Sequence, residues 1–292
     1  MGAPTPIVLE APAPAEQLER VRRRAVPIVV CVAAVVLLGI GILVVFGPWI
    51  APQDPLKQDL FNAGSGPGNG HPLGTDSLGR DVLSLSIAGA RAAVVGPVLI
   101  AAGAALIGAI TGLYAAWRGG IFDATASRIA DLMYALPGLL VVIVVVGVLG
   151  QGYWLGVTVL LVLSIPTSFR LTRSAATAQV RLPYVEVART LGLPARRILF
   201  RHLLPNVTPT ILATFLLDFV GALIGLAALA YLGLGTPPGT PDWGSLLADG
   251  QTLLNVNRWL SIAPAVLIVL TSGSVTILGD WLYDRYTQDG PA

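Results

Sequence analysis

The stretch from Ala25 to Phe46 reads AVPIVVCVAAVVLLGIGILVVF and carries no charged residue. Arginines 22–24 precede it, and Gly47-Pro48-Trp49 follows it. A bilayer core about 30 Å thick needs about 20 apolar residues in a helix, and Trp is enriched at membrane interfaces. The apolar part of a cleaved signal peptide is shorter, at roughly 7 to 15 residues. The stretch is therefore predicted to be a retained membrane-spanning helix.

The composition extends this prediction to the whole chain. Of its 292 residues, 54% are hydrophobic and only 12% are charged, and the mean hydropathy is +0.76, whereas soluble domains carry about 25% charged residues. The net charge of +2 is too even to indicate a nucleic-acid partner. With one cysteine, Cys31, and two distant histidines, His71 and His202, neither a disulfide framework nor a metal site is expected.

Six apolar stretches are long enough to span a bilayer, so the fold class is predicted to be an all-α integral membrane protein with six transmembrane helices. The fourth is expected to be short and to end around Pro166, and the second is rich in Ala and Gly, which lets helix backbones approach closely. The predicted spans are Ala25–Phe46, Ala93–Trp117, Ile129–Gly150, Tyr153–Phe169, Pro209–Leu234 and Ile262–Tyr283.

The basic residues predict the orientation. An even number of spans puts both termini on one side, and cytoplasmic loops of membrane proteins are enriched in Lys and Arg. With the N-terminus inside, all of the 18 basic residues except Lys57, Arg80, Arg91 and Arg258 lie on the cytoplasmic side. Both termini are therefore predicted to be cytoplasmic.

The chain divides accordingly into four predicted parts. The tail 1–24, with Pro4, Pro6, Pro12 and Pro14, has a composition typical of a disordered segment. Residues 25–92 contain the first span and an extracytoplasmic loop, and residues 93–285 hold the remaining spans. Within the latter, residues 170–205 form a loop between spans four and five, and 286–292 are a second cytoplasmic tail.

The extracytoplasmic loop contains the dense stretch His71 to Ser84, reading HPLGTDSLGRDVLS. Thr75 is expected to cap the turn that begins at Asp76, and Asp81 to begin a helix. Two interpretations of Asp76, Arg80 and Asp81 stay open. They belong either to a capped lid over the outer mouth or to a surface that contacts substrate.

The loop 170–205 has the pattern of two short helices. Tyr184 to Leu191 has helical character, Gly192 stands where a glycine ends a helix, and Pro194 fits the first turn of a second helix. This compact unit carries several arginines, so a simple solvated loop that holds the topology is one interpretation.

The same residues carry a resemblance. Glu186-Val187-Ala188, Gly192, His202 and Leu204-Pro205 match the spacing of Glu-Ala-Ala, three residues, Gly, nine residues and Ile-x-Leu-Pro. This signature is similar to that of bacterial ABC importer permeases, with Val187 and His202 as departures. Arg201-His202-Leu203-Leu204-Pro205-Asn206, the loop 71–84, Leu232 to Pro238 and Leu278-Gly279-Asp280 resemble the second-subunit (C) type of dipeptide, oligopeptide and nickel permeases. The resemblance covers about residues 25 to 285.

The resemblance implies one half of a heterodimeric pore in a bacterial inner membrane. The implied partners are a homologous permease subunit, two ATP-binding subunits that hold ATP and Mg, and an extracytoplasmic substrate-binding protein. The coupling residues implied are Glu186, Val187, Ala188, Gly192, His202, Leu204 and Pro205. The chain itself has no ATP-binding loop, because its single lysine, Lys57, is not preceded by glycine, and it is not expected to be an enzyme.

Acids within the spans are further candidates, because a charge in lipid is costly. Asp218 in the fifth span either lines a water-filled substrate path or hydrogen-bonds across a helix interface. Asp131 is expected to form a salt bridge near Arg128, and Asp280 to anchor the last span at the interface. A nickel-complex importer and, less favoured, an ion-coupled secondary transporter are the alternative functions, the latter usually needing charges in several spans.

Overall fold

The computed structural model describes residues 26–68, 70–237 and 239–288. These residues form helices and connecting loops, without a β-strand longer than an isolated bridge. The elements are α2 (Ile28–Ile50), η1 (Leu60–Asn62), α3 (Val82–Arg118), α4 (Gly120–Tyr134), α5 (Gly138–Leu149), α6 (Tyr153–Val180), α7 (Pro183–Thr190), α8 (Ala195–Ile198), η2 (Leu199–Leu203), α9 (Leu204–Tyr231), α10 (Trp243–Thr252) and α11 (Trp259–Gln288). The predicted tail 1–24 lies outside the described residues.

Five of the described helices are long and apolar enough to cross a membrane, and the bent pair of α4 and α5 makes up to six. Four of the predicted spans correspond to α2, α3, α9 and α11, each with shifted ends. The clearest shift is in α3, which begins eleven residues before Ala93, since Asp81 caps it as predicted by accepting a hydrogen bond from the Ser84 amide. The membrane-protein class is thus confirmed.

The third predicted span is not one helix. Tyr134 ends α4 and Gly138 begins α5, and the two axes differ by 80°. Pro137 lies at this break and lacks the amide that would continue the helix, and it restricts Leu136 before it. The prediction of an unbroken helix from 129 to 150 was therefore wrong.

The fourth predicted span was wrong in the opposite way. Pro166 lies inside α6, which continues to Val180. The continuation is held by neighbours, since Arg173 pairs with Asp123 of α4 through two nitrogen–oxygen contacts, one of them 2.6 Å long. A proline thus ends one apolar helix and is accommodated in the next.

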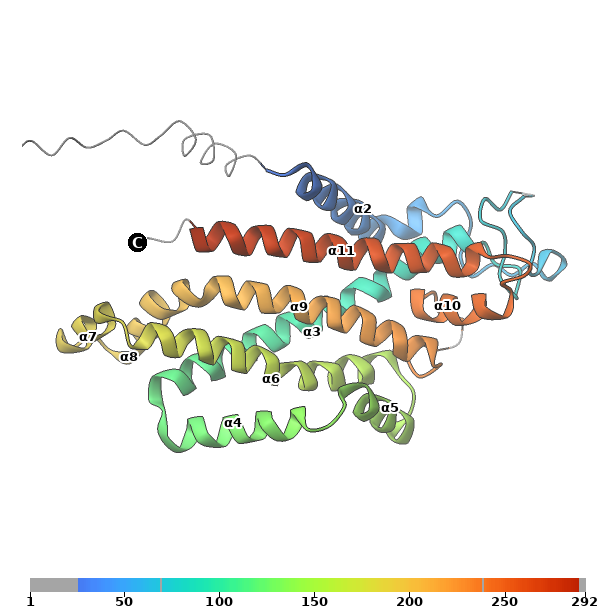
Figure 1. Ribbon diagram of the computed structural model, residues 1–292. Coiled ribbons are helices and arrows are strands. Elements are labelled where there is room, and N and C mark those ends of the chain that lie inside the picture. The colour runs from blue at the N-terminus through green and yellow to red at the C-terminus, as the bar shows by residue number, and fades with distance from the viewer. Residues whose placement is uncertain (1–25, 69, 238, 289–292) are drawn as a thin grey trace, which may run out of the picture.

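Helix α3 lies at the centre of the bundle and packs most extensively on α6 and α9, while α2 and α11 lie together on one side and α4 and α5 on another (Figure 1). Gly108 and Gly112 allow the close contact between α3 and α6. A methyl group at Gly108 would collide with Ser168, and one at Gly112 would meet the carbonyl oxygen of Phe169 at 2.8 Å. The glycine-rich second span therefore packs as its composition predicted.

Candidate functional site

The short helices α7 and α8 project together from one end of the bundle (Figure 1). We call residues 183–203 the knob. It has its own apolar core, in which Val185, Ala188, Ile198 and Leu203 are buried and pack near Leu113 of α3. Because the knob joins the ends of α6 and α9, its core fixes it rigidly on two long helices.

Gly192 shapes the knob. Its φ of +71° lies in the left-handed region that favours glycine. The Leu193 amide donates to the carbonyl of Ala188 at 3.2 Å, and the Gly192 amide donates to that of Arg189 at 3.0 Å. This pair of bonds is the Schellman motif, which ends α7 where the sequence predicted.

The knob separates the predicted coupling residues into two groups. Glu186, Val187 and Gly192 are exposed, and a methyl group added at Gly192 would meet nothing within 4 Å. Ala188 instead points into the knob core and is only 6% exposed, so its small side chain serves internal packing. Of the coupling residues that the resemblance implies, Ala188 is therefore not on the exposed surface of the knob.

Sequence reasoning missed Leu191, which is 73% exposed beside Gly192. Together with Val187, 55% exposed, it places apolar area at the tip of the knob. The only signal in the sequence is an apolar residue directly before the helix-ending Gly192, and its exposure is visible only in the structure. We call Glu186, Val187, Leu191 and Gly192 the knob tip.

The remaining coupling candidates lie at the base of the knob. His202 is half-buried, and its carbonyl accepts a hydrogen bond of 2.9 Å from the Asn206 side chain. Leu204 packs against the knob core, and Pro205 is exposed in the first turn of α9. Arg189 lies over the ring of Trp117 at 4.1 Å, which attaches α7 to the end of α3.

The opposite end of the bundle carries the lid, residues 51–81. Asp76 and Arg80 are buried there and form an ion pair of 2.6 Å. Asp76 also accepts from the amides of Leu78 and Arg80, at 2.9 and 2.8 Å, while Arg80 donates to the carbonyl of Gly239 at 3.0 Å. The Asp76 carboxylate therefore stabilises the turn from Asp76 to Arg80.

Thr75 does not cap that turn. Its hydroxyl instead accepts from the Ser65 amide at 2.9 Å and donates to the carbonyl of Asn62. Asp81 is buried between His71, at 3.1 Å, and the hydroxyl of Ser84, at 2.7 Å. The three candidate acids and bases of the lid thus have internal partners, which is the arrangement of the capped-lid interpretation.

The lid is fastened to the loop between α10 and α11, and α10 is fastened to the start of α3. Asn257 donates to the carbonyls of Leu73 and Thr75, at 3.0 and 3.1 Å, and the buried ring of Trp243 donates to the carbonyl of Ser86 at 2.8 Å. Asp242 caps α10, and burial raises the pKa of its carboxyl above the usual range. A cavity of about 350 Å³ remains between the lid and α10, with Arg80 and Asp249 in its wall.

Asp218 is buried at the contact of α9 with α6. It accepts a hydrogen bond of 2.7 Å from the hydroxyl of Ser168. This geometry matches the helix-interface interpretation of Asp218, and sequence reasoning did not foresee Ser168 as the donor.

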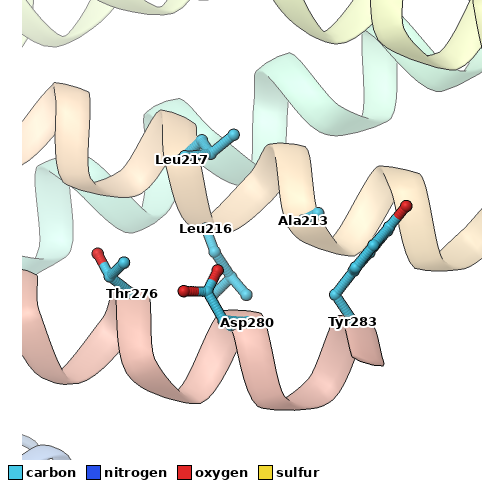
Figure 2. Close-up of a pocket in the computed structure, with 7 residues that line it drawn as sticks. Ala213, Leu216, Leu217, Thr276, Asp280 and Tyr283 are labelled. Atoms are coloured by element: carbon cyan, nitrogen blue, oxygen red, sulfur yellow. The ribbon is translucent and has the colours of Figure 1, made fainter. Parts of the chain in front are cut away.

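Asp280 lies on the groove between α9 and α11. Figure 2 shows its carboxylate between Thr276 and Tyr283 of its own helix, facing Leu216 of α9. These residues line a cavity of about 150 Å³. The acid therefore borders a helix–helix groove.

Charged residues also join α4 to α6. Asp131 lies 3.9 Å from Arg128, as predicted, but its close partner is Arg170 of α6. The guanidinium of Arg170 lies 4.3 Å over the ring of Tyr134, whose hydroxyl donates to Thr167 at 2.8 Å. This cross-helix group could not be predicted from the sequence, since Asp131 and Tyr134 belong to the third predicted span, whereas Thr167 and Arg170 come from the end of the fourth span and the loop after it.

Comparison with known proteins adds independent findings. Residues 104–288 match the family "Binding-protein-dependent transport system inner membrane component". The chain is 34% identical over 253 residues to the glutathione transport system permease protein GsiD of Escherichia coli O1:K1, covering 86% of this chain and 84% of that protein. GsiD of Shigella boydii serotype 4 matches with the same identity and coverage.

A solved structure is also similar in fold. The MetNI methionine ABC transporter in its inward-facing conformation matches with a TM-score of 0.56 at 18% identity. The match covers 69% of this chain and 96% of that chain.

Proposed function

Because this chain belongs to the family of binding-protein-dependent transport system inner membrane components, we propose that it is the permease subunit through which an ATP-driven importer admits peptides. Its membership makes it an ABC importer permease of the dipeptide, oligopeptide and nickel group and a multi-pass protein of the inner membrane. The finer assignments of substrate, partners and coupling residues are the proposal.

The observation that carries the proposal is the knob tip. An acid, two exposed apolar side chains and an open glycine turn stand on a rigid unit at the end of α6 and α9. Exposed apolar area in a fixed shape is typical of a surface that a partner covers. Glu186 supplies a charge that a basic group or a helix N-terminus of the partner can pair with.

We assign the partner at the knob tip as an ATP-binding subunit, one for each of two homologous permease subunits. ATP and Mg are bound by those subunits, and closure of the pair moves the two knobs toward each other. Since α6 and α9 run from the knob through the bundle, they transmit this motion as rigid bodies. His202, Leu204 and Pro205 act at the base of the knob, and Ala188 inside it.

The proposed coupling implies a topology and a division of the chain. The knob and both termini face the cytoplasm, as the distribution of arginines favours, and the lid faces outward, where a substrate-binding protein delivers its cargo. Residues 93–285 form the permease core, in which the stretch 170–205 contains the end of α6 and the knob that couples to the partner, and 25–92 supply the first helix and the lid.

A peptide is the proposed substrate, with dipeptides and oligopeptides as the class. Two relatives are named as glutathione permeases, and glutathione is itself a small peptide. A nickel complex is the alternative within the same group, since the resemblance covers both kinds of permease.

Co-expression with the neighbouring chromosomal genes, purification in mild detergent and an ATPase assay test the proposal. We expect ATP-binding subunits to co-purify and short peptides to stimulate hydrolysis in the presence of the binding protein. Stimulation by a nickel complex and not by peptides would select the alternative. A stable oligomer of this chain alone, with ion-dependent uptake and no ATPase, would contradict the proposal.

The coupling role is tested separately with Glu186→Ala at the tip and Arg181→Ala before the knob as a matched exposed control. We expect the first variant to remain in the membrane but to lose coupling between hydrolysis and transport. Normal transport by Glu186→Ala would overturn the role of the knob tip.

A further inference from the structure

Two exposed faces of this chain differ in chemistry. The face of α2 is purely apolar, as expected for contact with lipid, with Val29, Val32, Val35, Leu38, Ile42 and Val45 exposed. The face of α4 and α6 exposes Arg128, Asp131, Tyr134 and Arg170 among apolar side chains such as Ile129 and Leu132. The side chains of Asp131 and Arg170 are 50% and 43% exposed even though they are paired.

The depth of this pair follows from the packing of α6. The hydrogen bond between Ser168 and Asp218 places Ser168 level with the middle of α9. Arg170 lies two residues further along, which is about 3 Å at the helical rise. On the other side, Ser168 packs against Gly108 of α3, about ten residues or 15 Å before α3 ends at Arg118. The pair therefore lies on the knob side of the middle of α9, between that level and the end of α3.

Charged side chains at such a depth do not face lipid. Ionisable groups inside membrane spans almost always face the bundle interior or a water-filled space, because exposure to hydrocarbon is costly. In this chain the pair is on the outside of the bundle, where a second permease subunit would enclose a water-filled space beside it. Tyr134 and Thr167, which hydrogen-bond beside the pair, extend the polar strip.

We propose that Asp131 and Arg170 line the translocation path and contact the charged ends of a zwitterionic peptide. Arg170 offers guanidinium donors to a carboxylate, and Asp131 offers acceptor oxygens to an ammonium group. A peptide with free ends carries both groups. This inference rests on the proposed function and assigns the path to the face of α4 and α6, not to Asp218.

Accessibility to a hydrophilic thiol reagent tests the location. Cys31 is the only cysteine, so Cys31→Ala gives a background in which a single new thiol can be followed. Asp131→Cys is the probe, and Val35→Cys, on the apolar face of α2 and 68% exposed, is the control. In the assembled transporter we expect a charged methanethiosulfonate to label Asp131→Cys and to leave Val35→Cys unlabelled. Equal protection of both thiols would overturn the location.

Exchange of the two charges tests the contact with substrate. Asp131→Arg with Arg170→Asp keeps an ion pair and reverses its orientation. We expect uptake of a free dipeptide to fall about tenfold, the equivalent of one charged hydrogen bond, with less effect on the same dipeptide blocked at both ends. The matched exchange of Asp123 and Arg173 also joins α4 to α6 but is more buried, and it should leave the ratio of the two uptakes unchanged.

The outcomes separate this inference from the proposed function. If the exchanged Asp131 and Arg170 variant shows the wild-type ratio of free to blocked dipeptide uptake, the pair only holds α4 against α6. The proposed importer function would still stand in that case if peptides stimulate ATP hydrolysis. Loss of ATPase partners from the wild-type protein would instead contradict the proposed function itself.

Discussion

Ser168 of α6 donates a 2.7 Å hydrogen bond to the buried carboxylate of Asp218 in α9. The bond joins two helices that run from the knob through the bundle. Of the two interpretations of Asp218 that the sequence left open, the geometry matches the hydrogen bond across a helix interface, so its replacement is expected to act on stability.

We expect Asp218→Asn to retain the peptide uptake profile of the wild-type protein, because an amide oxygen still accepts from Ser168. Ser168→Ala should lower the free energy of unfolding by about 1–3 kcal/mol, the cost of a buried acceptor without a donor. Thermal unfolding in detergent and competition by cationic peptides measure the two effects. A selective loss of cationic substrates in Asp218→Asn would show that the acid faces the path.

Gly192→Ala should destabilise the knob by about 1–2 kcal/mol, because alanine is strained in the left-handed region. Gly192→Asn is the matched variant, since asparagine tolerates that conformation. Comparing the stimulation of ATPase activity in the two variants separates the effect of backbone strain at the turn from the effect of an added side chain. Equal damage in both variants would mean that side-chain bulk at the knob tip matters more than the backbone.

The contact between α3 and α6 depends on the absence of a side chain at Gly108. We expect Gly108→Ala to lower the apparent melting temperature, because overpacking a helix contact costs about 1–3 kcal/mol. Gly41→Ala in α2 is the control, as a methyl group there would meet nothing within 4 Å. An equal response of both variants in a thermal aggregation assay would contradict this explanation.

In the lid, Asp76→Asn leaves the buried Arg80 without its charge partner. Breaking a buried pair in this way costs about 3–5 kcal/mol, so we expect proteolysis of the loop 51–81 to accelerate. Asp54→Asn, at an exposed position of the same loop, should have little effect. Proteolysis of Asp76→Asn at the wild-type rate would show that the pair does not hold the lid.

Asp242, which caps α10 near the lid, makes the stability of the protein depend on pH. Burial raises the pKa of this carboxyl, so the folded state binds the proton more tightly than the unfolded state does. The contribution of Asp242 to stability therefore falls as pH rises from the unfolded pKa through the folded pKa. Asn caps helices as well as Asp does, so Asp242→Asn should be more stable than the wild-type protein at neutral pH, with the difference shrinking in acid. A constant difference between the melting temperatures would contradict the burial explanation.

The sequence predicted correctly those features that depend on interactions between neighbouring residues. The apolar run of α2, the cap at Asp81 and the helix-ending Gly192 each depend on residues next to one another. The same holds for the membrane class, because it follows from composition alone.

Features that depend on contacts between distant parts of the chain could not be predicted from the sequence. Pro137 and Pro166 both lie in apolar runs, yet only the first breaks its helix, since α6 beyond Pro166 is held by the pair of Arg173 and Asp123. Asp131 was matched to its neighbour Arg128, whereas its close partner comes from another helix.

The central helix α3 has a mechanical consequence. At 37 residues it is about 55 Å long, well beyond the bilayer core, and it begins at Asp81 in the lid and ends beside Trp117, on which Arg189 of the knob rests. One continuous helix thus connects the lid end of the molecule with the knob end. We therefore expect a displacement of the knob to reach the lid through one continuous helix, without passing through a loop.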